Sequence, residues 1–115
     1  MKYLLLVHLD GAEMAKQTKA EWAQLDKDSF EYDRELERSG HYITSAALRE
    51  PNEAVIVRRD GDSFATTDGP FVELKEHLGG FIYVEARDLN EAVAIAAKIP
   101  VGKFGAVEVR PVMEF

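Results

Sequence analysis

Two short segments of this chain are apolar on both faces of an expected β-strand. In the first, Lys2–Leu9, every residue from position 3 to position 7 is apolar. Phe81–Glu85 has the same character. Because successive side chains of a strand point to opposite faces, such segments need cover on both sides. The sequence therefore predicts a sheet in which these two strands are central and in which neither face is left in water.

The segment Lys19–Ser39 is expected to be a long helix. Thr18 and Glu21 form the pattern of a capping box at its start, and Gly40 follows at its end. Apolar and small residues recur at the spacing of one helical face, and most other positions are charged. The stripe expected to be buried consists of Trp22, Leu25, Ser29, Tyr32 and Leu36.

A second helix is expected to follow Asp88, whose side chain, together with Glu91, caps its first turn. Pro100 lies just beyond its end, where a helix cannot readily continue. Its expected apolar stripe consists of Leu89, Ala92, Val93, Ala96 and Ile99.

Four further strands are expected, at Tyr42–Leu48, Ala54–Arg59, Asp62–Thr67 and Ala106–Val112. The middle two are predicted to form a hairpin, because Asp60-Gly61 suits a type I′ turn whose central residues both need positive φ. The segment 72–77 is polar and charged, which predicts a single helical turn before the strand that starts at Phe81.

The resulting order of elements is β-α-β-hairpin-β-α-β. This order is typical of an α+β ferredoxin-like βαββαβ sandwich, here with an inserted hairpin, and residues 1–115 form one domain. Two helices cover only one face of such a sheet. The other face is also apolar, so we expect a homodimer in which two sheets pack face to face.

Composition excludes several classes of function. The chain has no cysteine, which excludes disulfides, thiol nucleophiles and zinc sites built on cysteine. Its 21 acidic and 14 basic residues give a net charge of −7, which argues against nucleic acid and against an anionic membrane surface. The N-terminal apolar run is too short for a signal peptide or a membrane helix, so we expect a cytoplasmic protein.

Asp68-Gly69-Pro70-Phe71 forms an expected rigid turn, because proline restricts the residue before it and glycine tolerates unusual backbone angles. With its surroundings, Thr67–Glu76 and then Leu78–Phe81, it strongly resembles the signature of the DGPF-domain branch of the YCII-related superfamily. Met1–Leu6, the helix start 88–92 and the segment 99–112 are similar to the same family, so the resemblance spans nearly the whole chain. It implies a dimeric α+β barrel with a ferredoxin-like protomer.

The resemblance implies little about a reaction. Members of this branch are largely of unknown function and are often encoded beside extracytoplasmic-function sigma factors. The wider superfamily has a proposed His–Asp pair, with the histidine on the first helix and the aspartate just before a proline after the second. Here the first helix has no histidine and the position before Pro100 is Ile99. The proposed chemistry of that pair therefore does not transfer to this chain.

Two residues are candidate catalytic groups. Asp68 is a general base or a ligand anchor in one interpretation, and a turn former whose carboxylate accepts backbone N–H groups in the other. His8 ends a central strand beside Asp10, where an imidazole suits acid–base chemistry. In the alternative interpretation His8 packs at the edge of the core or at the dimer interface.

Four residues are candidate ligand-binding groups: Glu73, Lys75, Glu76 and Tyr83. In the functional interpretation Lys75 holds an anionic substrate while a glutamate moves protons; in the structural one the three charged residues form solvated ion pairs of little energetic value. The three histidines lack the spacing of metal ligands, and no phosphate-binding or nucleophile motif appears. We therefore expect neither a metal nor a cofactor.

Three hypotheses of function follow. The first is an enzyme or binding protein for a small molecule, with the candidate residues around a cleft between sheet and loop and no reaction assigned. The second is a non-catalytic regulatory or interaction protein, linked through the resemblance to a sigma-factor pathway. The third is a stable dimer whose motif serves folding alone. The rigid turn leading into a charged segment favours the first.

Overall fold

The computed structural model describes residues 1–69 and 75–115. The remaining five residues, which include Pro70 and Phe71 of the motif and the candidate Glu73, lie outside the described part.

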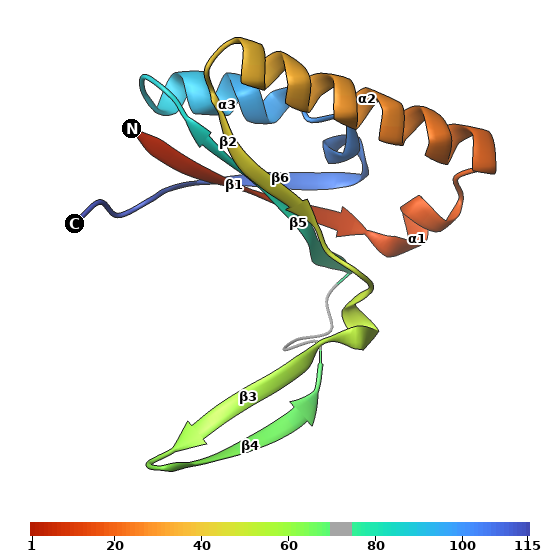
Figure 1. Ribbon diagram of the computed structural model, residues 1–115. Helices are drawn as coiled ribbons and strands as arrows, with labels where there is room; N and C mark the ends of the chain where they lie inside the picture. The colour runs from red at the N-terminus through yellow and green to blue at the C-terminus, as the bar shows by residue number, and fades with distance from the viewer. Residues whose placement is uncertain (70–74) are drawn as a thin grey trace.

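Four strands form an antiparallel sheet in the order β2-β5-β1-β6 (Figure 1). Their bounds are Tyr42–Ala47, Glu76–Glu85, Lys2–Asp10 and Gly105–Pro111. The central pair is β5 and β1, the two strands whose segments are apolar on both faces. This order is the one expected from the sequence, and the α+β fold class is confirmed.

Helices cover one face of this sheet. The long helix α2 (Lys19–Arg38) and the shorter α3 (Leu89–Ala97) lie side by side above it, and the short α1 (Gly11–Ala15) follows β1 directly (Figure 1). Two short 3-10 helices, η1 (Pro51–Glu53) and η2 (Pro100–Phe104), connect elements. No helix in the described part of the chain is long and apolar enough to cross a membrane.

The expected helix starts are confirmed in atomic detail. The Thr18 hydroxyl accepts the backbone N–H of Glu21, and the Glu21 carboxylate accepts the N–H of Thr18, which together make the capping box. Asp88 likewise accepts the N–H of Glu91 at 2.9 Å. Each contact satisfies a backbone donor that the first helical turn leaves unpaired, which fixes where α2 and α3 begin.

The hydrophobic core lies between the sheet and the two helices. Tyr3, Leu5, Val7 and Leu9 point from β1 toward the helices and are buried. Leu25, Tyr32 and Leu36 of α2 are buried as expected, whereas Trp22 stays more than one-third exposed. On α3 the prediction was wrong for Leu89 and Val93, which are about half exposed. The buried stripe there consists of Ala92, Ile95, Ala96 and Ile99.

Strand β5 begins earlier than the sequence predicts. Glu76 pairs with Asp10 and His77 with Leu9, so the expected helical turn is wrong for these residues. Gly79 is the extra residue of a bulge between the pairs Val7–Gly80 and His8–Leu78. A side chain at Gly79 would collide with the Leu9 side chain. Gly79 therefore allows close packing of β5 against Leu9 of β1.

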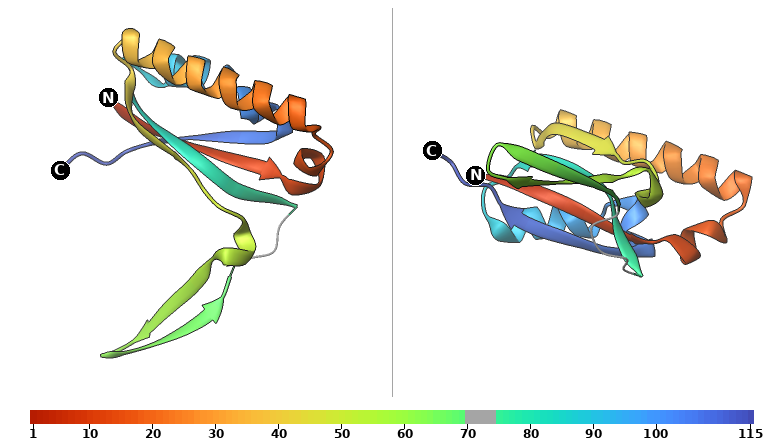
Figure 2. Two further views of the ribbon diagram at one scale, coloured as in Figure 1. Left: turned by 45° about the vertical axis from the view of Figure 1, so that its right-hand side comes forward. Right: turned by 90° about the horizontal axis from the view of Figure 1, so that it is seen from below.

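Strands β3 (Val55–Asp60) and β4 (Ser63–Asp68) form a separate two-stranded hairpin, called the arm below (residues 55–68). The expected hairpin is confirmed, but its turn is not the predicted one. Asp60 pairs with Ser63, so the central residues are Gly61 and Asp62, and of these two Gly61 alone has positive φ. That is the pattern of a type II′ turn. The arm projects beneath the sheet face that the helices leave uncovered (Figures 1 and 2).

Candidate functional site

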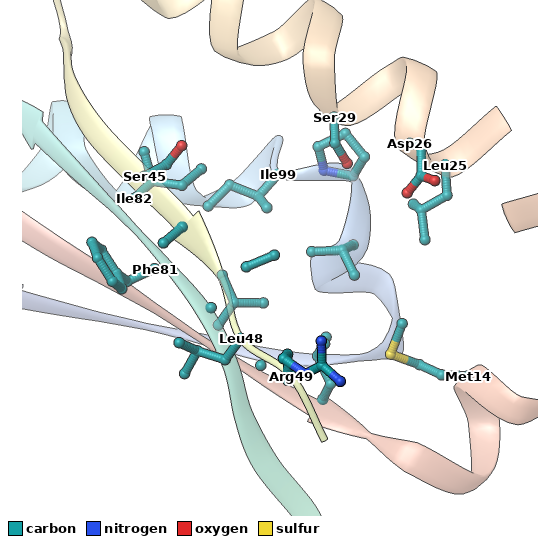
Figure 3. Close-up of a pocket in the computed structure, with 18 of the residues that line it drawn as sticks. Met14, Leu25, Asp26, Ser29, Ser45, Leu48, Arg49, Phe81, Ile82 and Ile99 are labelled. Carbon is teal, nitrogen blue, oxygen red and sulfur yellow. The ribbon is translucent and has the colours of Figure 1, made fainter. Parts of the chain in front are cut away.

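A half-open cavity of about 510 Å³ lies between α2 and the sheet (Figure 3). Its volume is within the range of small-molecule sites, which is roughly 300–1,000 Å³. Residues of β1, α1, α2, β2, β5 and η2 line it, so it is built where six elements meet. Much of the lining is apolar and includes Met14, Leu25, Leu48, Ile82 and Ile99.

Small residues on facing elements keep this cavity open. Ser29 takes a position in the α2 stripe between Leu25 and Tyr32, where a large apolar residue would fill the space. Across from the helix, β2 contributes Ala46 and Ala47, and β5 contributes two glycines. The cavity is thus a direct result of residue size at these positions.

Two polar residues of the cavity lining, Asp33 and Ser45, belong to a chain of hydrogen bonds that continues to Tyr42 outside the lining. The Ser45 hydroxyl donates to the Asp33 carboxylate, with Oγ and Oδ2 3.4 Å apart. The Tyr42 hydroxyl lies 2.7 Å from Ser45 Oγ and is the donor there, because the single proton of Ser45 is directed at Asp33. Burial raises the pKa of Asp33, and the nearby Glu37 acts in the same direction, while the Ser45 hydrogen bond opposes it.

Asp33 has the properties of a residue in a functional site. A carboxyl group with a raised pKa that borders an apolar cavity is a functional-site candidate, because its proton can be donated or accepted nearer neutral pH than usual. The hydroxyl chain fixes its orientation.

The charged part of the lining lies nearer solvent. Asp26 and Glu50 are acidic, and Arg49 is the basic residue beside them. The Arg49 guanidinium is held by Glu53: its Nε lies 3.0 and 3.1 Å from the two carboxylate oxygens. Since that charge is already paired, the lining favours ligand groups that donate hydrogen bonds.

His8, a predicted catalytic residue, lies on the opposite face of the sheet from this cavity. Its Nε2 is 3.3 Å from Glu108 Oε1, and Glu108 also accepts a hydrogen bond from Arg110. The Arg110 hydrogen bond is the main cause of the lowered pKa of Glu108, and the His8 hydrogen bond adds to it. His8 therefore belongs to a partly exposed charged row on strands β1 and β6.

Lys75 and Glu76, predicted ligand-binding residues, lie beside Asp10. Lys75 Nζ is 3.7 Å from Asp10 Oδ2, and Glu76 is paired with Asp10 in the sheet register. Asp10 is buried and accepts the backbone N–H groups of Ala12 and Glu13, which caps α1. The contacts of this group are thus those of a helix cap with an ion pair.

The structure brings only some of the predicted site residues together: Glu76 pairs with Asp10, two residues along β1 from His8, and Lys75 also contacts Asp10. Asp68 is exposed at the base of the arm, where it pairs with Val55. Tyr83 shares a sheet face with His8 but pairs with Leu4, four residues away along β1 and hence about 13 Å distant. Asp68, His8, Lys75, Glu76 and Tyr83 all lie outside the cavity lining.

The sequence contained two signals for the cavity. One is Ser29, a small polar residue at the centre of an otherwise apolar helical stripe. The other is the pair Gly79-Gly80 within a strand, where side chains would normally fill the space. His77 of β5 also lines the cavity and is only partly exposed.

Positions related to the superfamily's proposed His–Asp pair also border this cavity. Ile99 and Pro100 line it, and Ile99 occupies the position where the resemblance implies an aspartate. An isoleucine cannot move a proton, whereas Asp33 of α2, which also lines the cavity, can. Among the described residues, no group of three or more histidine, aspartate or glutamate side chains is placed to hold a metal ion.

Comparison with known proteins agrees with this fold. The family model of the YCII-related domain matches residues 1–115. An uncharacterised protein of Rhizobium meliloti (strain 1021) is 28% identical over 113 residues, which cover 96% of this chain and 91% of that protein. The match extends from the first strand to the last and includes every element that lines the cavity. The chain therefore belongs to the YCII-related domain family.

Proposed function

We propose that this protein binds a small molecule in the cavity between α2 and the sheet. The observation that carries the proposal is a cavity of about 510 Å³ whose apolar lining meets one oriented carboxyl group, Asp33. Sites for small ligands combine an apolar surface with a few fixed polar groups in this way. The ligand has an apolar body and a polar end that donates a hydrogen bond to Asp33.

This proposal moves the site away from the residues chosen from the motif. His8 and the Lys75–Glu76 group lie at the same end of β1 and Asp68 lies on the arm, and none of them lines the cavity, whereas Asp33, Ser45 and Tyr42 are connected by hydrogen bonds. The proposed membership of the DGPF-domain branch rests on the motif 68–71 and does not by itself indicate the ligand.

A cavity-filling variant tests the proposal. A thermal-shift screen of metabolites is expected to find compounds that raise the melting temperature of the wild-type protein. Ligand at about 100 times its dissociation constant adds about 2.7 kcal/mol to the free energy of unfolding. In Ser29→Phe, the new ring occupies the cavity, so the shift is expected to disappear.

Ala23→Phe is the matched control, because Ala23 is exposed on the same helix and does not line the cavity. It should retain the full shift. A screen without any stabilising compound, or a shift that persists in Ser29→Phe, would contradict the proposal.

We also propose that the protein is a homodimer whose uncovered sheet faces pack together into an α+β barrel. Leu4, Leu6, Phe81 and Tyr83 alternate with the buried residues of β1 and β5 and so point to this face. A sheet face of this composition is more stable against an apolar surface than in water.

Light scattering at micromolar concentration checks this second proposal. The expected mass is twice that of the 12.9 kDa chain. A mass of one chain at that concentration would overturn it.

A further inference from the structure

The arm has almost no core of its own. All its residues are exposed except Ile56, and the exposed fractions of Val55, Val57 and Phe64 are 59%, 60% and 69%. An isolated two-stranded hairpin is marginally stable in water, and it needs a packed face to hold its shape. A surface that covers the arm would therefore stabilise it.

One face of the arm carries its large apolar residues. Val57 pairs with Thr66 and Arg59 with Phe64, and directly opposite residues share a face. Because side chains alternate along each strand, Val55, Val57 and Phe64 fall on that same face. The opposite face carries Ile56 and mostly small or polar residues: Arg58, Asp60, Ser63, Ala65 and Thr67.

The exposed area of the whole chain indicates how large the missing contact is. The surface is 8290 Å², whereas a compact monomer of this mass exposes about 6,300 Å². The excess is about 2,000 Å² per chain. An obligate homodimer buries about 1,000–2,500 Å² on each protomer, so the excess equals one such interface.

The overall dimensions agree with this area. The radius of gyration is 16.0 Å, against about 13 Å for a compact domain of this length. Figure 1 shows the cause: the arm extends beneath the sheet and diverges from it.

We propose that each arm closes over a second copy of this chain and packs Val57 and Phe64 against it. A second copy is the occupant because a two-fold axis places both arms in equivalent surroundings and closes the assembly at two chains. The chain also supplies its own apolar surface, the uncovered sheet face beside the arm. This inference rests on the homodimer proposed above and adds to it that the arm, and not the sheet face alone, holds the two chains together.

Excision of the arm tests this inference. The backbone N–H of Gly69 donates to the carbonyl oxygen of Ala54 at 2.6 Å, so the two ends of the arm are adjacent. Residues 55–68 can therefore be replaced by a two-glycine linker without moving β2 or β5. The excised protein is expected to keep its circular dichroism and cooperative unfolding. Its dimer dissociation constant, measured by analytical ultracentrifugation, should rise by about 100-fold or more.

Point variants keep the test valid if the excised protein fails to fold. Val57→Ser with Phe64→Ser removes the apolar face of the arm and should weaken the dimer in the same direction. Ala65→Ser with Thr67→Ser changes the opposite face and should leave the dissociation constant unchanged.

The outcomes separate the two proposals. A wild-type dimer whose dissociation constant is unaffected by Val57→Ser with Phe64→Ser and by excision overturns the role of the arm and leaves the sheet-face dimer standing. A monomeric wild-type protein overturns both. A dimer that weakens equally when either face of the arm is changed also contradicts the inference, because the apolar face would then have no special part.

Discussion

Replacing Leu5 by alanine is expected to lower the free energy of unfolding by about 3 kcal/mol, within the usual range of 2–5 kcal/mol for such core truncations. Leu5 is 0% exposed and lies at the centre of the sheet, opposite Ile82 on one side and Val109 on the other. Its side chain points toward the helices, where neighbouring residues are fixed and cannot collapse into the space left behind. Urea unfolding followed by circular dichroism measures the loss.

The preceding residue provides a matched control. Leu4 is the same residue type on the same strand, but it points to the face that the helices leave uncovered. Leu4→Ala is therefore expected to act on dimerisation, so its effect on the melting temperature should depend on protein concentration. By contrast, most of the stability that Leu5→Ala loses should be the same at every protein concentration. Equal, concentration-independent losses in both variants would contradict this assignment of the two faces.

The two sides of β1 also explain why the sheet was predictable from sequence. The apolar run 3–7 and the segment Phe81–Glu85 required central positions, and the observed order β2-β5-β1-β6 places both there. The helix caps at Thr18 and Asp88 were equally informative, because a cap depends on residues within one helical turn. Features of this kind are local, and a single sequence contains all the information they need.

Strand limits and turn type depended on more distant contacts. Glu76 and His77 are polar and follow a charged segment, yet both are in β5 because Asp10 and Leu9 of β1 supply their pairing partners. Tertiary pairing outweighs local preference in such cases. The hairpin turn shifted by one residue because Asp60 pairs with Ser63, which leaves Gly61 as the first central residue.

The candidate site was the least predictable feature. Charged residues of the motif were prominent in the sequence, but the structure places Asp68 on the arm and Lys75 beside Asp10, both outside the cavity lining. The cavity instead arises where small residues on α2, β2 and β5 face one another, and Asp33 looks like a member of a charged helical face until Ser45 is seen beside it. Residue size becomes informative only once the elements are known to face each other.

Stability is expected to fall above about pH 10 because of one buried tyrosine. The Tyr32 hydroxyl donates to the backbone carbonyl of Ile95 at 2.6 Å, which connects α2 to α3. Burial, and to a lesser extent the charge of Glu35, raises the pKa of Tyr32 to about 12. The unfolded chain has the ordinary tyrosine pKa of about 10. Between about pH 10 and about pH 12, the folded protein therefore keeps the proton on Tyr32, whereas the unfolded chain releases it.

Because the pKa of Tyr32 is higher in the folded protein than in the unfolded chain, the free energy of unfolding falls as the pH rises. The contribution of Tyr32 is fully present below about pH 10 and is lost as pH rises through about 12. Two pKa units correspond to about 2.7 kcal/mol, so a loss on the order of 2–3 kcal/mol is expected. Urea unfolding at a series of pH values between about 9 and 12 measures it.

Tyr32→Phe separates this effect from the titration of other tyrosines and of lysines. The variant keeps the ring and loses the hydroxyl, while the Ile95 carbonyl still accepts the backbone N–H of Lys98. The difference in unfolding free energy between wild type and variant should therefore shrink by 2–3 kcal/mol over about two pH units above pH 10. In a near-ultraviolet pH titration of the folded proteins, the wild type should show one tyrosine that ionises near pH 12, and Tyr32→Phe should lack it. A difference that stays constant with pH would mean that Tyr32 ionises as readily in the folded protein as in the unfolded chain, and that its contact with α3 does not hold the proton.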